Sequence, residues 1–247
     1  MIKPILKVTL AAVLFAGFVS CKESQKTGAN KENSNAAGQT ATATVALDKE
    51  QIISDIQFLS SKECEGRRPG SKGHQLALDL VLSRMRASGL DSIGGSIIQN
   101  FTGRSLNGYT EGRNVVAFAK GKKYPDQYMV LTAHYDHVGK RGDTAWFAGA
   151  DDNASGSAAA MAIAGYLGKN QPDYSIIVAL LDREETGLEG AYALVEYLKK
   201  TLGESAVRFN LNLDMIGRND KNELYVWNPS SSGTGGSGEN GAGENNR

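Results

Sequence analysis

The first two helices are predicted by apolar residues that recur every three or four positions. Asp48 can cap a helix that continues to about residue 59. The apolar face of this helix carries Ile52, Ile53, Ile56 and Leu59. A second helix is expected over residues 72–88, where Gly89 ends it. Between the two helices, residues 65–73 are rich in Gly, Arg and Pro and predict turns.

The rest of the folded region alternates apolar strands with helices. Runs of apolar and β-branched residues predict strands at 97–102, 114–119, 127–133, 174–182, 207–214 and 223–227. Helices are expected over 153–167 and 188–202. Because strand and helix alternate in the second half, we expect crossover helices on the faces of a mostly parallel sheet. The earlier strands can pair antiparallel at one edge. The predicted fold class is α/β, with three αβα layers and a mixed, mostly parallel sheet.

The first twenty residues have the pattern of a secretion signal. Lys3 and Lys7 precede an apolar run, residues 8–19, that is short for a membrane span. The segment Phe18-Val19-Ser20-Cys21 resembles the lipobox of bacterial lipoproteins, although Leu is more usual than Phe at its first position. We therefore predict a lipoprotein signal peptide over 1–20 and lipidation of Cys21, which would attach the chain to the membrane of the bacterial envelope. The alternative is plain secretion with cleavage elsewhere.

Composition separates a folded region from two polar segments. Residues 21–46 are mostly Ser, Asn, Gly, Thr, Ala, Lys and Gln, and predict a flexible tether. Residues 47–228 contain the predicted domain, and residues 229–247 are too polar to build a core. The 247 residues have a formal net charge of zero and no basic stripe, so a nucleic-acid partner is not expected. Cys64 is expected to be a small buried or half-buried residue and not a nucleophile.

Imidazole and carboxylate groups follow three of the predicted strands. His134 and Asp136 follow the first, Glu184 and Glu185 the second, and Asp214 the third. Asp151, in the pair Asp151-Asp152, lies at the start of the intervening helix. Ligands of open α/β sheets bind at the carboxyl ends of the strands, and His with carboxylate is a zinc-binding combination. Crowded carboxylates repel one another, and a pair of divalent cations about 3.5–4 Å apart would relieve that repulsion.

Four ordered motifs resemble those of the co-catalytic di-zinc aminopeptidases. This family includes bacterial leucyl aminopeptidases, aminopeptidase Y and the peptidase domain of glutamate carboxypeptidase II. The motifs are His134-Tyr135-Asp136, Gly149-Ala150-Asp151-Asp152, Glu184-Glu185-Thr186-Gly187 and Asn212-Leu213-Asp214-Met215. The segment 66–73 also matches a motif of that family, and the resemblance covers about residues 47–227. It implies the zinc-exopeptidase fold, peptide substrates and hydrolysis of N-terminal peptide bonds.

The resemblance also implies a role for each matching residue. His134 and Asp214 would bind one zinc ion, Glu185 the other, and Asp151 would bridge the two. Glu184 would be the general base that takes a proton from a metal-bound water, so that hydroxide attacks the scissile carbonyl. Asp136 would hydrogen-bond the free ring nitrogen of His134. In the family the peptide bond after the bridging aspartate is often cis, which here would be Asp151-Asp152.

Weaker expectations concern residues near these motifs. His137 does not match a ligand position in the family, and a structural or indirect role is favoured over metal contact. Trp146 and Phe147 would either line a substrate pocket or anchor a loop. Arg218 is expected to form a structural ion pair. His74 is expected to be exposed on the second helix.

The sequence departs from the family in one ligand. The family uses a further histidine well downstream of the Asn-Leu-Asp-Met motif, whereas the three histidines here are His74, His134 and His137. The second zinc position is therefore expected to keep only Glu185 and Asp151. We expect a truncated or frame-shifted copy of a peptidase, whose activity is in question. A glutaminyl cyclase-like single-zinc enzyme and a catalytically dead lipoprotein remain the alternatives.

Overall fold

A five-stranded mixed sheet forms the centre of the computed structural model, which describes residues 46–105 and 108–218. In sequence order its strands are β1 (Ile98–Ser105), β2 (Gly108–Ala119), β3 (Tyr124–His134), β6 (Tyr174–Leu181) and β7 (Val207–Asn212). Their spatial order is β1-β2-β6-β3-β7. The pairs β3–β6 and β3–β7 are parallel, whereas β2 is antiparallel to both of its neighbours. The carboxyl ends of β3, β6 and β7 therefore meet at one edge.

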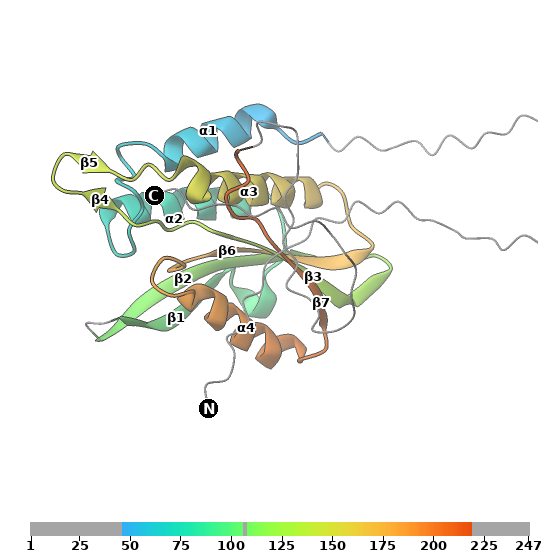
Figure 1. The fold of residues 1–247 in the computed structure, drawn as a ribbon. Coiled ribbons are helices and arrows are strands. Elements are labelled where there is room, and N and C mark those ends of the chain that lie inside the picture. The colour runs from blue at the N-terminus through green and yellow to red at the C-terminus, as the bar shows by residue number, and fades with distance from the viewer. Residues whose placement is uncertain (1–45, 106–107, 219–247) are drawn as a thin grey trace, which may run out of the picture.

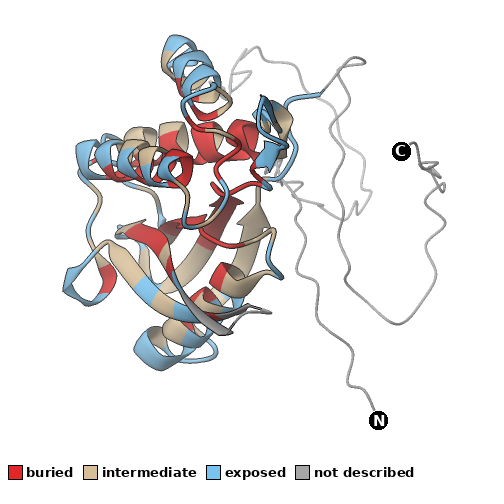
Figure 2. Ribbon diagram, turned by 90° about the vertical axis from the view of Figure 1, so that its left-hand side faces the viewer, coloured by how far each residue is buried: buried red, intermediate tan, exposed pale blue. Residues whose placement is uncertain are grey.

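Helices cover both faces of this sheet (Figure 1). On one face lie α1 (Lys49–Leu59), α2 (Lys72–Ala87) and α3 (Gly156–Leu167), and on the other lies α4 (Glu189–Leu202). The first interface packs Leu78 and Met161 against Leu131, and the second packs Leu194 and Leu198 against the opposite face. Figure 2 shows the buried residues concentrated between these layers. The fold is the three-layer αβα arrangement predicted from the sequence.

Local sequence signals explain where the helices begin. The Asp48 carboxylate accepts a hydrogen bond from the Gln51 amide at 2.9 Å, and the Ser71 hydroxyl accepts one from the His74 amide at 3.1 Å. Each satisfies a main-chain donor in the first turn of its helix. Gly190, in the first turn of α4, lies so close to β6 that a Cβ atom there would be 2.2 Å from the Asp182 carbonyl oxygen. This glycine lets α4 pack directly on the sheet.

Several elements differ from the expectations. The strands β2 and β3 are longer than predicted, and α3 begins at Gly156 after an irregular π-type turn, η2 (Ala150–Ser155). A short 3₁₀ turn, η1 (Ile93–Gly95), and a small hairpin of β4 (Lys140–Arg141) and β5 (Ala145–Trp146) were not anticipated. Among the described residues, no helix is long and apolar enough to cross a bilayer. The predicted signal peptide with Cys21, the tether up to residue 45, the strand 223–227 and the polar segment 229–247 lie outside the described residues.

Candidate metal centre

The carboxyl ends of three parallel strands deliver the candidate site. The last residue of β3 is His134, Glu184 and Glu185 follow β6, and Asp214 follows β7. The turn η2 brings Asp152 to the same edge. Asn153, which is fully buried, fixes this turn to the end of β7 by donating to the Leu213 carbonyl oxygen at 2.9 Å. The sheet edge thus gathers groups from four separate segments of the chain.

A first group of possible ligands consists of His134, Asp152 and Asp214. The Nε2 atom of His134 lies 3.3 Å from Oδ1 of Asp152 and 3.6 Å from Oδ1 of Asp214. Two ligand atoms held at about 2.0–2.1 Å from a tetrahedral zinc ion are themselves about 3.3 Å apart. His134 and Asp152 therefore already have the spacing that a zinc ion requires, and Asp214 lies slightly farther from His134. His134 is buried, so its ring is held in place.

A second group consists of His137, Asp152 and Glu185. The Nδ1 atom of His137 is 2.7 Å from Oε1 of Glu185, and the ligand atoms of all three residues lie within 4.8 Å of one another. Asp152 belongs to both groups. One carboxylate shared by two sets of imidazole and carboxylate ligands is the arrangement of a two-metal site.

The structure places Asp152, and not Asp151, where the sequence analysis expected the bridging ligand. Asp151 belongs to neither group. Its Oδ1 atom accepts a hydrogen bond from the Gly217 amide at 2.8 Å, and Oδ2 lies 3.8 Å from Nε of Arg218, which is the ion pair expected for that arginine. Asp151 therefore ties the chain after β7 to η2. The cis peptide bond was also predicted one residue too early, because it joins Asp152 and Asn153.

Asp136 contacts the site differently from the prediction. The Nδ1–H group of His134 donates to the main-chain carbonyl oxygen of Asp136 at 3.2 Å, while the nearer carboxylate oxygen is 3.6 Å away. The Asp136 carboxylate instead accepts hydrogen bonds from the amides of Glu184 and Glu185, at 3.0 and 3.3 Å. The main chain of Asp136 thus sets the His134 tautomer that turns Nε2 toward the carboxylates, and its side chain orients the glutamate pair.

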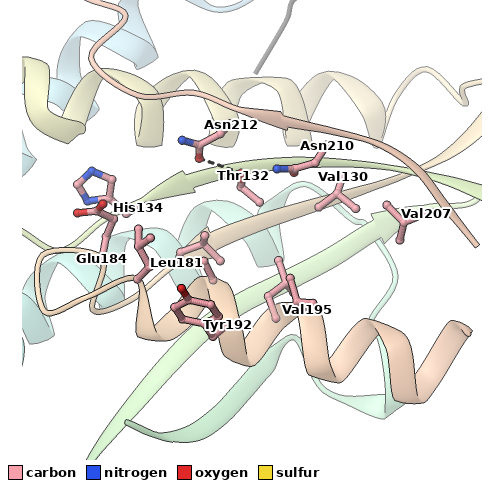
Figure 3. Close-up of a pocket in the computed structure, with 13 residues that line it drawn as sticks. Val130, Thr132, His134, Leu181, Glu184, Tyr192, Val195, Val207, Asn210 and Asn212 are labelled. Carbon is pink, nitrogen blue, oxygen red and sulfur yellow. Dashed lines mark hydrogen bonds between the residues drawn. The ribbon is translucent and has the colours of Figure 1, made fainter. Parts of the chain in front are cut away.

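Glu184 lies at one end of an elongated pocket of about 230 Å³ between α4 and the strands β3 and β7 (Figure 3). His134 lies at the same end, and the pocket continues away from them along an apolar wall. This wall includes Val130, Leu181, Tyr192, Val195 and Val207. Trp146 and Phe147 are not among the lining residues: the Trp146 ring donates to the Ser60 carbonyl oxygen at 3.4 Å and anchors its loop.

The ionisation of these groups reflects their crowding. Burial acts to lower the pKa of His134, but its interactions with Asp136, Asp152 and Asp214 outweigh that effect and raise this pKa well above its ordinary value. Contact with His134 lowers the pKa of Asp152. Burial raises the pKa of Glu184; His134 opposes this change, and Glu185 adds to it. A cation is favoured among the carboxylates, and Glu184 is a stronger base than an exposed glutamate.

A buried arginine, whose role the sequence analysis missed, holds the loops of the site together. Arg67 is fully buried. Its guanidinium donates to main-chain carbonyl oxygens at the end of α1 and in the loops that form the site. The acceptors are Leu59, Tyr135, Ala148, Gly149 and Asp152, at 2.6 to 3.3 Å. Burial lowers its pKa to about 10, which leaves it charged at neutral pH. The only sequence signal was its place in the Gly-Arg-Arg-Pro-Gly motif.

The prediction that His74 is exposed was wrong. Its side chain is buried, with Nε2 2.8 Å from Oδ1 of Asp182 and its ring stacked on Tyr135 at 5.2 Å between centroids. Asp182, which directly follows β6, also accepts a hydrogen bond from the Arg113 amide at 2.9 Å. Nothing in the sequence near His74 indicates this pairing, because its partner lies 108 residues away. Cys64 is buried, as predicted.

The donors fit zinc on chemical grounds. Imidazole nitrogen and carboxylate oxygen are its usual ligands at catalytic sites, and His134 and Asp152 of the first group have the required spacing. An αβα fold with such groups at its strand ends is typical of a metal-dependent enzyme. Residues 114–244, slightly more than half of the chain, match the model of peptidase family M28. The chain belongs to this family, which confirms the resemblance on which the sequence analysis relied.

Curated relatives share part of the chain. A probable zinc metalloprotease of Pyrenophora tritici-repentis is 32% identical over 163 residues, which are 60% of this chain and 32% of that protein. Aminopeptidase YwaD of Bacillus subtilis is 36% identical over 119 residues, 46% of this chain and 24% of that protein. The chain spans about a third of the length of the first relative and a quarter of that of the second.

Solved structures share the fold. The leucine aminopeptidase precursor from Bacteroides thetaiotaomicron has a TM-score of 0.54 at 20% identity, and the match covers 70% of this chain and 63% of that one. Acidobacteriales bacterium glutaminyl cyclase has a TM-score of 0.57 at 24% identity, covering 72% and 63% of the two chains. The fold alone is therefore common to peptidases and cyclases.

Proposed function

We propose that this chain is a zinc-dependent aminopeptidase that hydrolyses the N-terminal bond of peptides. The observation that carries the proposal is the Asp152 carboxylate, which two groups of possible ligands share, together with Glu184, which lines the same pocket as His134. Membership of peptidase family M28 supports the same reaction class. Zinc, when bound, would supply Lewis-acid chemistry by polarising the scissile carbonyl and lowering the pKa of water.

The residues of the chain would divide the remaining tasks. His134 and Asp214 would hold one zinc ion, Glu185 the other, and Asp152 would bridge them in place of Asp151. Glu184 would take a proton from the attacking water and later give it to the leaving amine. Its raised pKa suits a group that must both accept and return a proton. Asp136 would keep Glu184 and Glu185 in position through their main-chain amides.

The apolar pocket beside Glu184 supports a preference for substrates with an apolar N-terminal residue. The pocket wall consists of aliphatic and aromatic side chains. Binding an apolar substrate group against this wall is favourable because it removes apolar surface from water. A leucine p-nitroanilide should therefore be hydrolysed faster than the lysine or glutamate analogue. Equal rates for all three would contradict this part of the proposal.

Glu184→Gln tests the reaction. The amide keeps the shape of the side chain but cannot accept the proton, so turnover of leucine p-nitroanilide should fall by about 10²–10⁴-fold. Zinc content should not change, because Glu184 is in neither ligand group. Glu196→Gln on the exposed surface of α4 is the matched control and should retain full activity. If Glu184→Gln were as active as the unchanged chain, the assignment of the base would be wrong.

The glutaminyl cyclase-like reaction is the second candidate, and the fold likeness to Acidobacteriales bacterium glutaminyl cyclase favours it. The cyclase-like reaction needs one zinc ion, whereas the presence of a second ligand group supports a centre with two zinc ions. A peptide with N-terminal glutamine separates the reactions, since cyclisation releases ammonia and hydrolysis releases free glutamine. Turnover of neither substrate by the zinc-loaded chain would favour a catalytically inactive lipoprotein.

We also infer that the chain is held at the bacterial envelope by lipid on Cys21. The support is the sequence alone: Lys3 and Lys7, the apolar run and the Phe-Val-Ser-Cys segment. Multiple acyl chains would give stable anchoring. In cells fed labelled palmitate, the unchanged chain and Ser20→Ala should carry the label, and Cys21→Ala should not. An unlabelled unchanged chain would overturn the anchor.

A further inference from the structure

His137 is placed in the second ligand group by contacts from three sides. Its main-chain amide donates to the Arg67 carbonyl oxygen at 3.1 Å. Its ring lies against Gly149, where an added Cβ would be 2.6 Å from the ring Cδ2 atom, and Phe147 packs edge-on at 6.4 Å between centroids. Gly149 also has a φ of +60°, which favours glycine. The imidazole is therefore held with Nδ1 directed at Glu185.

The three histidines of the sequence have separate positions. His74 pairs with Asp182 in the interior, and His134 belongs to the first ligand group. His137 is the imidazole that lies next to Glu185, and it is buried. A hydrogen bond to Glu185 alone would make it a positioning residue. The convergence of Asp152 on the same point adds a third donor, which completes a set of one nitrogen and two carboxylate ligands.

We propose that His137 is a direct ligand of the second zinc ion, together with Glu185 and the shared carboxylate of Asp152. This proposal rests on the proposed function, because it concerns the same centre. The Nδ1–Oε1 separation of 2.7 Å is that of a hydrogen bond. It must widen to about 3.3 Å for both atoms to bind one zinc ion. That widening is small enough for a glutamate side chain to provide by rotation.

Imidazole nitrogen NMR of the full chain tests the proposal directly, because three histidines give three resolvable rings. With ¹⁵N-labelled histidine and two equivalents of Zn²⁺, the ring nitrogens of His134 and His137 should shift to the range of coordinated imidazole. His74 should not shift and serves as an internal reference. Unchanged His137 nitrogens would overturn the proposal, whether or not His134 responds.

Zinc titration provides the second measurement. The unchanged chain should bind two zinc ions, and His137→Ala should retain one while affinity for the other falls by more than about 100-fold. An orienting residue outside the ligand set would weaken binding by about 10–100-fold. Val138→Ala, an exposed neighbour on the same loop, should bind two ions unchanged. Equal binding by His137→Ala and the unchanged chain would overturn the proposal.

The two measurements separate this proposal from the proposed function. Coordination by His137 without peptide hydrolysis would establish the ligand and reject the aminopeptidase. Peptide hydrolysis with zinc on His134 but not on His137 would retain the aminopeptidase and reject the ligand. Failure of both imidazoles to shift would reject the metal centre and the ligand together.

Discussion

The carboxylate of Asp136 accepts a hydrogen bond from the main-chain amide of Glu184 at 3.0 Å and is fully buried. A second bond, from the Glu185 amide, reaches the other carboxylate oxygen. One side chain after β3 thus fixes the main chain of both glutamates after β6. The distance between the first histidine and the glutamate pair depends on this contact.

Asp136→Asn should reduce turnover by about 10–100-fold, because the new NH₂ group would face an amide that also donates. Zinc affinity should fall as well, since Glu185 loses its fixed position. Asp143→Asn, in the exposed β4–β5 hairpin, is the control and should change neither value. Activity assays and zinc titration provide the two measurements. Unaltered turnover in Asp136→Asn would show that the glutamate pair does not depend on this contact.

A comparison of two neighbouring substitutions identifies the bridging ligand. Asp152→Asn should weaken the binding of both zinc ions, because Asp152 belongs to both ligand groups. The loss of affinity should be more than about 100-fold, which is larger than the loss expected for a residue outside the ligand set. Asp151→Asn should bind zinc normally, since an amide oxygen can still accept from Gly217. Zinc titration of both variants measures the difference. The reverse result would restore Asp151 as the ligand.

Arg67→Met should lower the free energy of unfolding by at least about 3 kcal/mol. The methionine can fill part of the space, but five carbonyl oxygens lose a charged donor, and each buried unsatisfied acceptor costs about 1–3 kcal/mol. Arg68→Met is the matched control, because Arg68 is exposed. Urea unfolding compares the two variants. A loss as small as that of the control would mean that the loops do not need Arg67.

Tyr135→Phe should destabilise the protein at pH 8 and stabilise it, relative to the unchanged chain, at pH 11. The Tyr135 hydroxyl donates to the Arg113 carbonyl oxygen at 2.9 Å, so its loss costs about 1 kcal/mol at pH 8. Burial raises the pKa of Tyr135 well above its ordinary value, and neighbouring carboxylates add to the rise. Above pH 10 this phenol ionises in the unfolded chain but not in the folded one. The free energy of unfolding of the unchanged chain therefore falls by up to about 1.4 kcal/mol per pH unit.

The phenylalanine variant has no phenol and does not lose stability in this way. It should therefore become the more stable protein near pH 11. Urea midpoints at pH 8, 10 and 11 measure the crossing. Tyr174→Phe, at a partly exposed position on β6, controls for the general effect of alkaline pH. A stability difference that stays constant across this range would contradict a buried, neutral phenol.

The fold was predictable because its signals are local. Asp48 caps the first helix as expected, the second helix begins at the expected residue 72, and the apolar runs of β3 and β6 became the central strands. The irregular turn η2 was not predictable in this way. Its shape depends on Asn153, which bonds to a carbonyl 60 residues away at the end of β7. Sequence patterns carry periodicity but not such long-range contacts.

The site was predicted in its composition and missed in its details. His134, Glu185 and Asp214 lie at the strand ends as expected, because parallel strands bring their carboxyl ends together. Two adjacent aspartates are equivalent in a sequence, and only the backbone of η2 decides that Asp152 faces the histidines. The buried pair of His74 and Asp182 escaped prediction for a similar reason, since the two residues lie 108 positions apart in the sequence.

The hydrogen bonds of Arg67 also imply an order of events during folding. Apart from the bond to Leu59, they reach carbonyl groups 68 to 85 residues further along the chain. Contacts at such separations form more slowly than helices, because a long loop must close first. In a refolding experiment, helical signal should therefore return before zinc affinity. A chain emerging from the ribosome could therefore hold metal only after residues 135–152 had folded back onto Arg67.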